Sequence, residues 1–186
     1  MSLRVTFELE DKDLKYFKRQ MNIAKGTAKT TPESEVIESA KEMMSQIAAK
    51  KVPGFVRQRI DVLGQLVAML EDDEWALAAA ERKNVVSALA YFAEPQDIIP
   101  DDIPILGFID DAIMIELVAI ELKHELDAFN DFCAYRRGEA ARKRNPNATR
   151  EEYIDSKRRA LHSRMRRRRK AMRSRGGAGH TRVRLF

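Results

Sequence analysis

Apolar residues recur three and four positions apart through most of this chain, and this spacing limits the possible fold more than any other feature. Residues 36–47 and 56–70 both follow it, which places their apolar side chains along one face of a helix. The 186 residues include only eight glycines and six prolines, too few to supply the turns of many short strands. The sequence therefore predicts an all-α fold, a compact bundle of about five or six helices.

The helix boundaries follow from the breaks in this spacing. Trp75 is expected to pack just after the acidic turn 71–74, and residues 3–9 alternate apolar and polar side chains as a short strand does. The expected helices are 11–26, one capped by Thr31 or Ser34, 56–70, one through 85–92, a long central helix over 110–136, and a last one opened by a capping box of Thr149 and Glu152.

Residues 94–111, here called the hinge, interrupt the helices with three prolines and five aspartates. The prolines forbid a continuous helix, and the carboxylates of Asp97 and Asp101 can accept hydrogen bonds from the main-chain amides that such a break leaves free. Asp110 is expected to cap the long helix, Asp111 to favour its positive end, and Gly107 to allow a turn or a close helix approach. The favoured interpretation is a structural turn.

A metal site is a second interpretation of the hinge. Clusters of carboxylate oxygens suit Mg²⁺, Ca²⁺ or Mn²⁺, and a divalent-metal-dependent hydrolase could use them if the prolines fold the segment back on itself. The spacing does not have the register of an EF-hand loop. The candidate metal ligands are Asp97, Asp101, Asp102, Asp110 and Asp111.

A membrane segment is a third interpretation. Residues 103–120 form an 18-residue stretch rich in apolar side chains, close to the length that crosses a bilayer. It contains Asp110, Asp111 and Glu116, and each acidic group costs about 2.5 to 3.5 kcal/mol at the bilayer centre. This cost argues against a true span and leaves shallow insertion, or association with a membrane, as the alternative.

The pattern over residues 88–111 is A-L-A-Y-F-x-x-P-x-D-x-I-P-D-x-I-P-x-L-G-x-I-D-D. It resembles the signature of the YkvA-like domain, a bacterial family of unknown function, and the resemblance extends more loosely over about residues 60–130. It implies a small helical domain without an assigned reaction, in a family whose members are often labelled as membrane proteins. The residues that match the signature are Tyr91, Pro95, Asp97, Pro100, Asp101, Pro104, Gly107, Asp110 and Asp111.

Charge is distributed unevenly along the chain. Residues 1–135 hold 15 Lys and Arg against 25 Asp and Glu, a net charge of −10, whereas residues 136–186 hold 19 against 4, a net charge of +15. An acidic body joined to a basic arm indicates a partner that is a polyanion, or an arm that folds back on its own body.

The basic arm is expected to stay partly disordered until a polyanion neutralises it, because stacked arginines repel one another and apolar residues are few. RNA or DNA and anionic lipid are the two predicted partners, and a solubilising tail or one docked on the body is the alternative. No aromatic residue interrupts 158–175, which favours phosphate contacts over base stacking. The candidate polyanion-binding residues are Arg158, Arg159, Arg164, Arg166, Arg167, Arg168, Arg169, Lys170, Arg173 and Arg175.

Three regions are predicted: an N-terminal segment over 1–31, a helical body over 32–138 that could recruit a protein partner, and the basic arm over 139–186. Cys133 is the single cysteine, and the first residues do not resemble a signal peptide, so a cytoplasmic location is expected. The sequence has no phosphate-binding glycine loop and no nucleophile elbow, so it favours a binding or scaffold protein without a cofactor over an enzyme.

Overall fold

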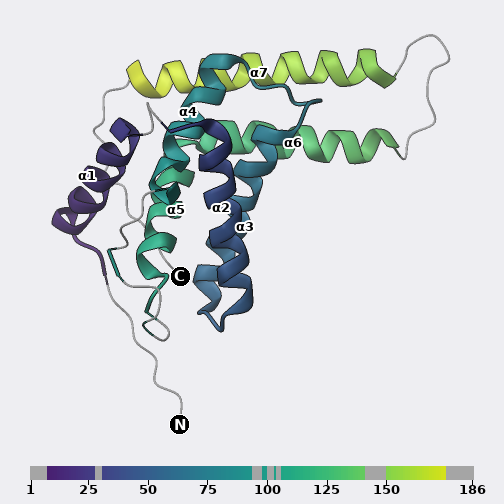
Figure 1. The fold of residues 1–186 in the computed structure, drawn as a ribbon. Helices are drawn as coiled ribbons and strands as arrows, with labels where there is room; N and C mark the ends of the chain where they lie inside the picture. The colour runs from purple at the N-terminus through teal and green to yellow at the C-terminus, as the bar shows by residue number, and fades with distance from the viewer. Residues whose placement is uncertain are drawn as a thin grey trace.

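The computed structural model describes residues 8–27, 31–93, 98–99, 103, 106–140 and 150–174. These residues form seven α-helices and one short 3-10 helix, with no strand among them (Figure 1), which confirms the predicted all-α fold. The strand-like segment predicted at 3–9 falls largely outside the described residues. The elements are α1 (Asp11–Thr27), α2 (Glu33–Ala49), α3 (Gly54–Glu71), α4 (Ala79–Leu89), η1 (Ala90–Ala93), α5 (Ile109–Glu121), α6 (Lys123–Ala140) and α7 (Arg150–Ser174).

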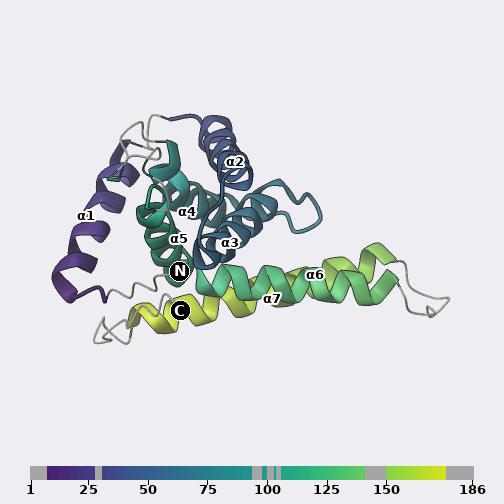
Figure 2. The same cartoon turned by 90° about the horizontal axis from the view of Figure 1, so that it is seen from below.

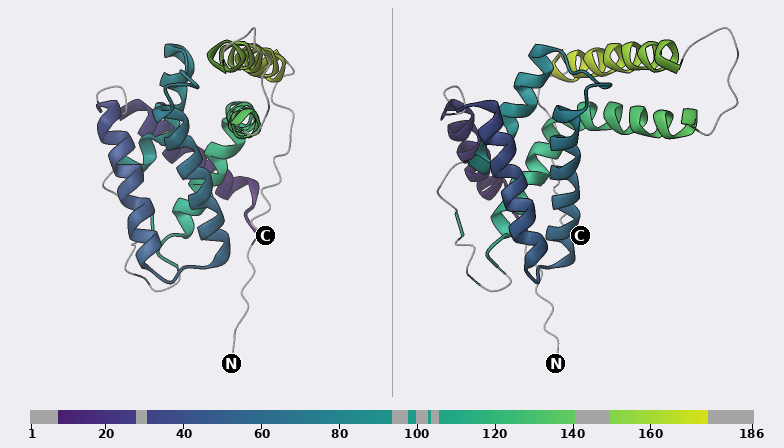
Figure 3. Two further views of the ribbon diagram at one scale, coloured as in Figure 1. Left: turned by 90° about the vertical axis from the view of Figure 1, so that its right-hand side faces the viewer. Right: turned by 45° about the vertical axis from the view of Figure 1, so that its right-hand side comes forward.

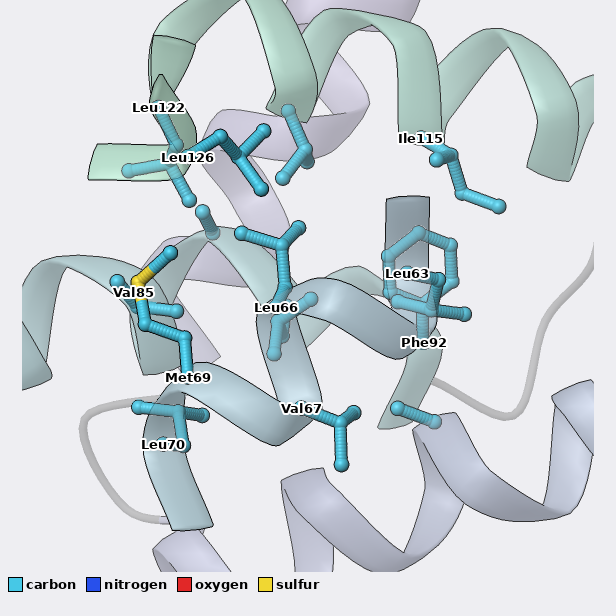
Figure 4. Close-up of a cluster of buried hydrophobic side chains, with 14 of the residues drawn as sticks. Leu63, Leu66, Val67, Met69, Leu70, Val85, Phe92, Ile115, Leu122 and Leu126 are labelled. Atoms are coloured by element: carbon cyan, nitrogen blue, oxygen red, sulfur yellow. The ribbon is translucent and has the colours of Figure 1, made fainter. Parts of the chain in front are cut away.

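Helix α3 supplies a large part of the core, because it packs against α2, α4, α5 and α6. Its residues Leu63, Leu66 and Met69 are fully buried. Figure 4 shows them beside Val85 of α4 and Ile115 of α5, which also belong to the core. The apolar stripe predicted over 56–70 is therefore confirmed as a core-facing stripe.

Proline, and not a capping hydroxyl, precedes helices α2 and α3. Pro32 and Pro53 occupy the two cap positions, with φ of −58° and −56°, and neither helix has a side-chain cap hydrogen bond. The expected cap of α2 by Thr31 or Ser34 is therefore wrong. The fixed φ of proline sets the direction in which each helix starts, and Glu33 in the first turn of α2 suits the positive helix end.

The long central helix predicted over 110–136 is two helices that meet at a corner. Leu122 separates α5 from α6 with φ −97° and ψ 18°, and Figure 1 shows α6 turning sharply away from the direction of α5. The Leu122 side chain is buried, and its N–H still donates to the Val118 carbonyl at 2.9 Å. Packing of this buried corner ends α5 at a point where the sequence has no proline or glycine.

Helices α6 and α7 lie side by side and form a hairpin that projects from the body made by α1–α5 (Figures 2 and 3). The arm was expected to be partly disordered, yet α7 is one continuous helix of 25 residues. Ile154, Leu161 and Met165 are buried on it. These three apolar residues, spaced for one helix face, pack α7 against the core, and the rest of the arm lies outside the described residues, so its partial disorder stays a prediction.

Candidate functional site

Asp110 closes the hinge from the first turn of α5. Its side chain is fully buried, and Oδ2 accepts hydrogen bonds from the main-chain N–H groups of Ile98 at 3.0 Å and Ile99 at 2.9 Å. The carboxylate therefore holds a part of the hinge that lies eleven and twelve residues earlier in the chain. Burial raises the pKa of Asp110, and hydrogen bonds from main-chain amides, that of Ile99 foremost, act against this rise.

The structure places some of the predicted hinge residues and corrects one role. Asp110 does not cap α5, because Phe108 holds the cap position without a side-chain hydrogen bond. Asp111 is buried in the first turn of α5, Gly107 donates its N–H to the Ile103 carbonyl at 3.0 Å, and Tyr91 is buried in η1. Outside the described residues lie Pro95, Asp97, Pro100, Asp101, Asp102 and Pro104.

Neither alternative interpretation of the hinge gains support. Within the described residues, no three acidic, histidine or cysteine side chains gather as metal ligands would. Asp97, Asp101 and Asp102 are not described, so the metal-dependent hydrolase stays a hypothesis. No helix in the described part of the chain is both long and apolar enough to span a membrane. The apolar residues from Ile109 to Val118 are mostly buried in the body.

A shallow hollow of about 310 Å³ lies between α3, α5 and α6. Its lining includes Val62 and Leu126 together with polar side chains. The amide of Asn130 donates to Gln65 at 3.0 Å, and Lys123 pairs with Asp127 at 3.2 Å, so polar groups at its edge are already paired with each other. The hollow therefore offers no evident catalytic arrangement.

The loop between α3 and α4, residues 72–78, fastens the hairpin to the body. Trp75 is fully buried in this loop, and its ring lies 5.1 Å from Phe132 of α6 and 4.2 Å, edge-on, from His162 of α7. The main-chain N–H of Trp75 donates to Asp72 Oδ1 at 2.8 Å, and this hydrogen bond fixes the turn that carries the indole. Trp75 thus packs just after the acidic turn, as expected, and it touches both hairpin helices.

Charged groups of the same loop hold Arg136 of α6. Arg136 pairs with Asp72 at 2.8 Å and with Glu74 at 2.9 Å. The hydrogen bond to Asp72 raises the pKa of the Arg136 guanidinium, against the opposing effect of burial. Arg158 of α7 donates to the Glu74 carbonyl at 3.3 Å. Both helices of the hairpin are therefore attached to the loop by arginines.

His162 is a buried titratable group at this junction. Burial lowers the pKa of His162, and the positive charges of Arg166 and Arg158 lower it further. Glu81 on α4 and a hydrogen bond with the Trp75 main chain act in the opposite direction. The neutral imidazole is therefore the form that suits the docked helix.

The predicted polyanion-binding residues divide into two sets on α7. Arg158 and Arg159 pair with Asp155, and Arg164 pairs with Asp131 of α6. Arg169 pairs with Glu125 of α6 at 3.0 Å, and Arg166 with Glu81 of α4 at 3.6 Å. The other described candidates are exposed and have no ion pair with any described residue; they are Arg167, Arg168, Lys170 and Arg173, here called the free cation cluster. Arg175 lies outside the described residues.

Residues 84–117 match the model of the family described as "Protein of unknown function (DUF1232)". This segment runs from α4 through η1 and the hinge into α5, and it is consistent with the resemblance to the YkvA-like family. No curated protein and no solved structure matches the chain.

The DUF1232 match includes Asp110 and ends before α6, so the free cation cluster lies outside it. Sequence reasoning missed three carboxylates that pair with arginines of α7, namely Glu81, Glu125 and Asp131. Glu125 had a detectable signal, because it falls three residues after Leu122 and four before Phe129, on the buried side of α6. Glu81 had none, because its partner is 85 positions away in the chain.

Proposed function

We propose that this protein binds the phosphate backbone of a nucleic acid through the free cation cluster on α7. The observation that carries the proposal is the contrast along this helix, where four exposed cations lack an ion pair among the described residues while their neighbours are paired. Among the described candidate residues, the cluster therefore carries the positive charge that no carboxylate neutralises.

The size of the cluster suits a duplex backbone. Residues 167–173 span about 9 Å of helix axis at 1.5 Å per residue. Duplex DNA carries one phosphate charge per about 1.7 Å of its axis, so about five phosphates lie within that length. Release of counterions from those phosphates gives affinity without sequence readout. The lack of an aromatic residue over 158–175 agrees with contacts to the backbone and not to the bases.

A nucleic acid is favoured over an anionic membrane because the apolar face of α7 is already covered. Ile154, Leu161 and Met165 are buried, and Met172, 57% exposed, is the one large apolar side chain of the described α7 that is well exposed. Helices that lie in a bilayer surface bury a broad apolar face there, which docked α7 does not offer. The proposal assumes the predicted cytoplasmic location, and the protein partner predicted for the body stays a prediction.

The test is a fourfold substitution to glutamine, R167Q/R168Q/K170Q/R173Q, assayed by fluorescence anisotropy on duplex DNA, duplex RNA and anionic vesicles. For four phosphate contacts, the wild-type slope of log Kobs against log salt is expected to be about −3.6. The variant should lose most of its affinity for duplex, and its slope should approach zero.

The control carries the same loss of charge elsewhere. K15Q/K18Q/K51Q/R57Q removes four cations that are exposed on α1, on α3 and just before α3. It should retain the wild-type salt slope. Equal losses in the two variants would contradict the proposal, and binding to vesicles without binding to duplex would identify an anionic membrane as the partner.

A further inference from the structure

Two arginines of α7 are held by carboxylates that the body and α6 bury. Glu125 on α6 is 1% exposed and lies 3.0 Å from Arg169, whose side chain is 24% exposed. Glu81 on α4 is 10% exposed and lies 3.6 Å from Arg166. Glu81 and Glu125 are here called the acidic seat. Because Glu125 is enclosed by the docked helix, a polyanion cannot replace it at Arg169 while α7 stays in place.

The withheld arginines alternate in sequence with the free cation cluster. Arg166 and Arg169 are three residues apart and lie on one side of the helix, Arg166 with its side chain 52% exposed and Arg169 24% exposed, so Arg169 is the arginine that docking covers most, whereas Arg167, Arg168 and Lys170 are exposed and unpaired among the described residues. The docked orientation of α7 therefore decides which cations can reach a ligand. Release of the helix from the acidic seat would add two cations to the cluster.

We propose that docking of α7 on the acidic seat is an autoinhibitory contact that withholds Arg166 and Arg169 from the nucleic-acid backbone. This inference rests on the function proposed above and adds its regulation. A backbone that engages all six cations and a pair of carboxylates that engages two of them compete for the same helix. A ligand that binds the undocked form better shifts the population toward it, and a weaker seat raises the apparent affinity.

The chain contains its own reporter of docking. Trp75 is the single tryptophan, it is fully buried, and its ring touches His162 of α7. Departure of α7 removes that neighbour and hydrates the indole. Titration of the wild-type protein with duplex should leave Trp75 emission in place, because the free cation cluster binds while α7 stays docked, whereas a variant with a weakened seat should show emission at longer wavelength and more quenching by acrylamide, in parallel with binding.

The decisive variant is E81Q/E125Q, which removes the charge of the seat and keeps the side-chain size. Its affinity for a 20-base-pair duplex should rise by about tenfold, and its salt slope should become steeper by about 1.8, the increment for two further phosphate contacts. The matched control is E71Q/E121Q, which removes two carboxylates paired with Lys41 and Lys25 away from α7. The control allows for the change in net charge and should keep the wild-type slope.

The outcomes separate this inference from the proposed function. Salt-sensitive duplex binding by the wild type, with the same affinity and slope in E81Q/E125Q as in E71Q/E121Q, would overturn the autoinhibitory contact alone. Equal duplex binding by R167Q/R168Q/K170Q/R173Q and by its control K15Q/K18Q/K51Q/R57Q would overturn the proposed function.

A second pair of variants tests the same inference if E81Q/E125Q does not fold by circular dichroism. R166Q/R169Q and R167Q/R168Q remove equal charge from adjacent positions of one helix. Withheld arginines contribute little to binding, so R166Q/R169Q should stay within about twofold of wild-type affinity for duplex, whereas R167Q/R168Q should weaken binding by tenfold or more. Equal losses would show that all four arginines reach the ligand in the docked state.

Discussion

Asp110 stabilises the hinge by accepting two main-chain hydrogen bonds with one carboxylate oxygen. Burial makes the charged form costly, which is why the pKa of this group rises, and the amides of Ile99 and Ile98 repay part of that cost. The sequence predicted such bonds for Asp97 and Asp101, which lie outside the described residues, and a capping role for Asp110. It could not predict that Asp110 would bond to the main chain of residues 98–99, because that contact joins positions eleven and twelve residues apart.

Replacement of Asp110 should reveal the value of these two bonds. Asp110→Ala leaves two amides without an acceptor and is expected to lower the free energy of unfolding by about 2–4 kcal/mol. Asp110→Asn keeps an acceptor oxygen and removes a buried charge, so it should cost clearly less. Urea denaturation at pH 7 measures both, with the exposed Asp61→Ala as a control expected within about 0.5 kcal/mol of wild type. Equal losses for Ala and Asn would refute this role.

At the scale of helices, the regular spacing of apolar residues predicted where helices form, but it did not predict the directions in which they run. The stripes over 36–47 and 56–70 correspond to α2 and α3. The corner at Leu122 had no local signal, since residues 121–123 suit a helix interior and the turn depends on burial of the Leu122 side chain in the core. Docking of α7 had a periodic signal in Ile154, Leu161 and Met165, but its long-range ion pairs leave no such pattern in a sequence.

Docking of α7 is expected to weaken in mild acid through His162. Its pKa in the docked state lies below the ordinary 6.5, so the undocked state takes up the proton more readily, and docking loses stability as pH falls from about 6.5 through the lowered pKa. Arg158 and Arg166 on α7 oppose protonation, and Glu81 on α4 favours it. Hydrogen exchange of α7 amides should therefore be faster at pH 5.5 than at pH 7.5, after correction for intrinsic rates.

His162→Phe keeps an aromatic ring against Trp75 and removes the titration, so its corrected exchange should depend less on pH. His124→Gln provides the matched control on α6 and should retain the wild-type dependence. A wild-type profile that is flat between these two pH values would refute the role of His162.

At the scale of the whole molecule, the uneven charge of the chain is partly resolved within the fold. The basic arm returns to the acidic body, where Asp131, Glu81 and Glu125 each pair with an arginine of α7. The charge distribution left two outcomes open, a docked arm and an arm free for a polyanion. The structure combines them, because one face of α7 is docked and the free cation cluster is exposed. Composition alone could not divide the nine described candidate residues into these two sets.

Removal of residues 150–186 should therefore harm the body as well as the arm. Ile154, Leu161 and Met165 lose their packing, and burial of each such side chain contributes about 1.5–3 kcal/mol. The truncation should therefore lower the free energy of unfolding by several times as much as a surface substitution does. Trp75 emission should shift to longer wavelength. R167Q/R168Q/K170Q/R173Q should leave both the emission and the melting temperature near wild type. A truncated chain with wild-type emission would show that α7 does not cover Trp75.

Helix α4 connects α7 of the basic arm with the segment that matches the DUF1232 model. Glu81, which meets Arg166, lies one helical turn before residue 84, where the DUF1232 match begins, and α4 has only 11 residues before it continues into Tyr91 and the hinge. Undocking of α7 removes one restraint on the rotation of α4. Undocking of α7 is therefore expected to affect the hinge even when no ligand contacts both of them.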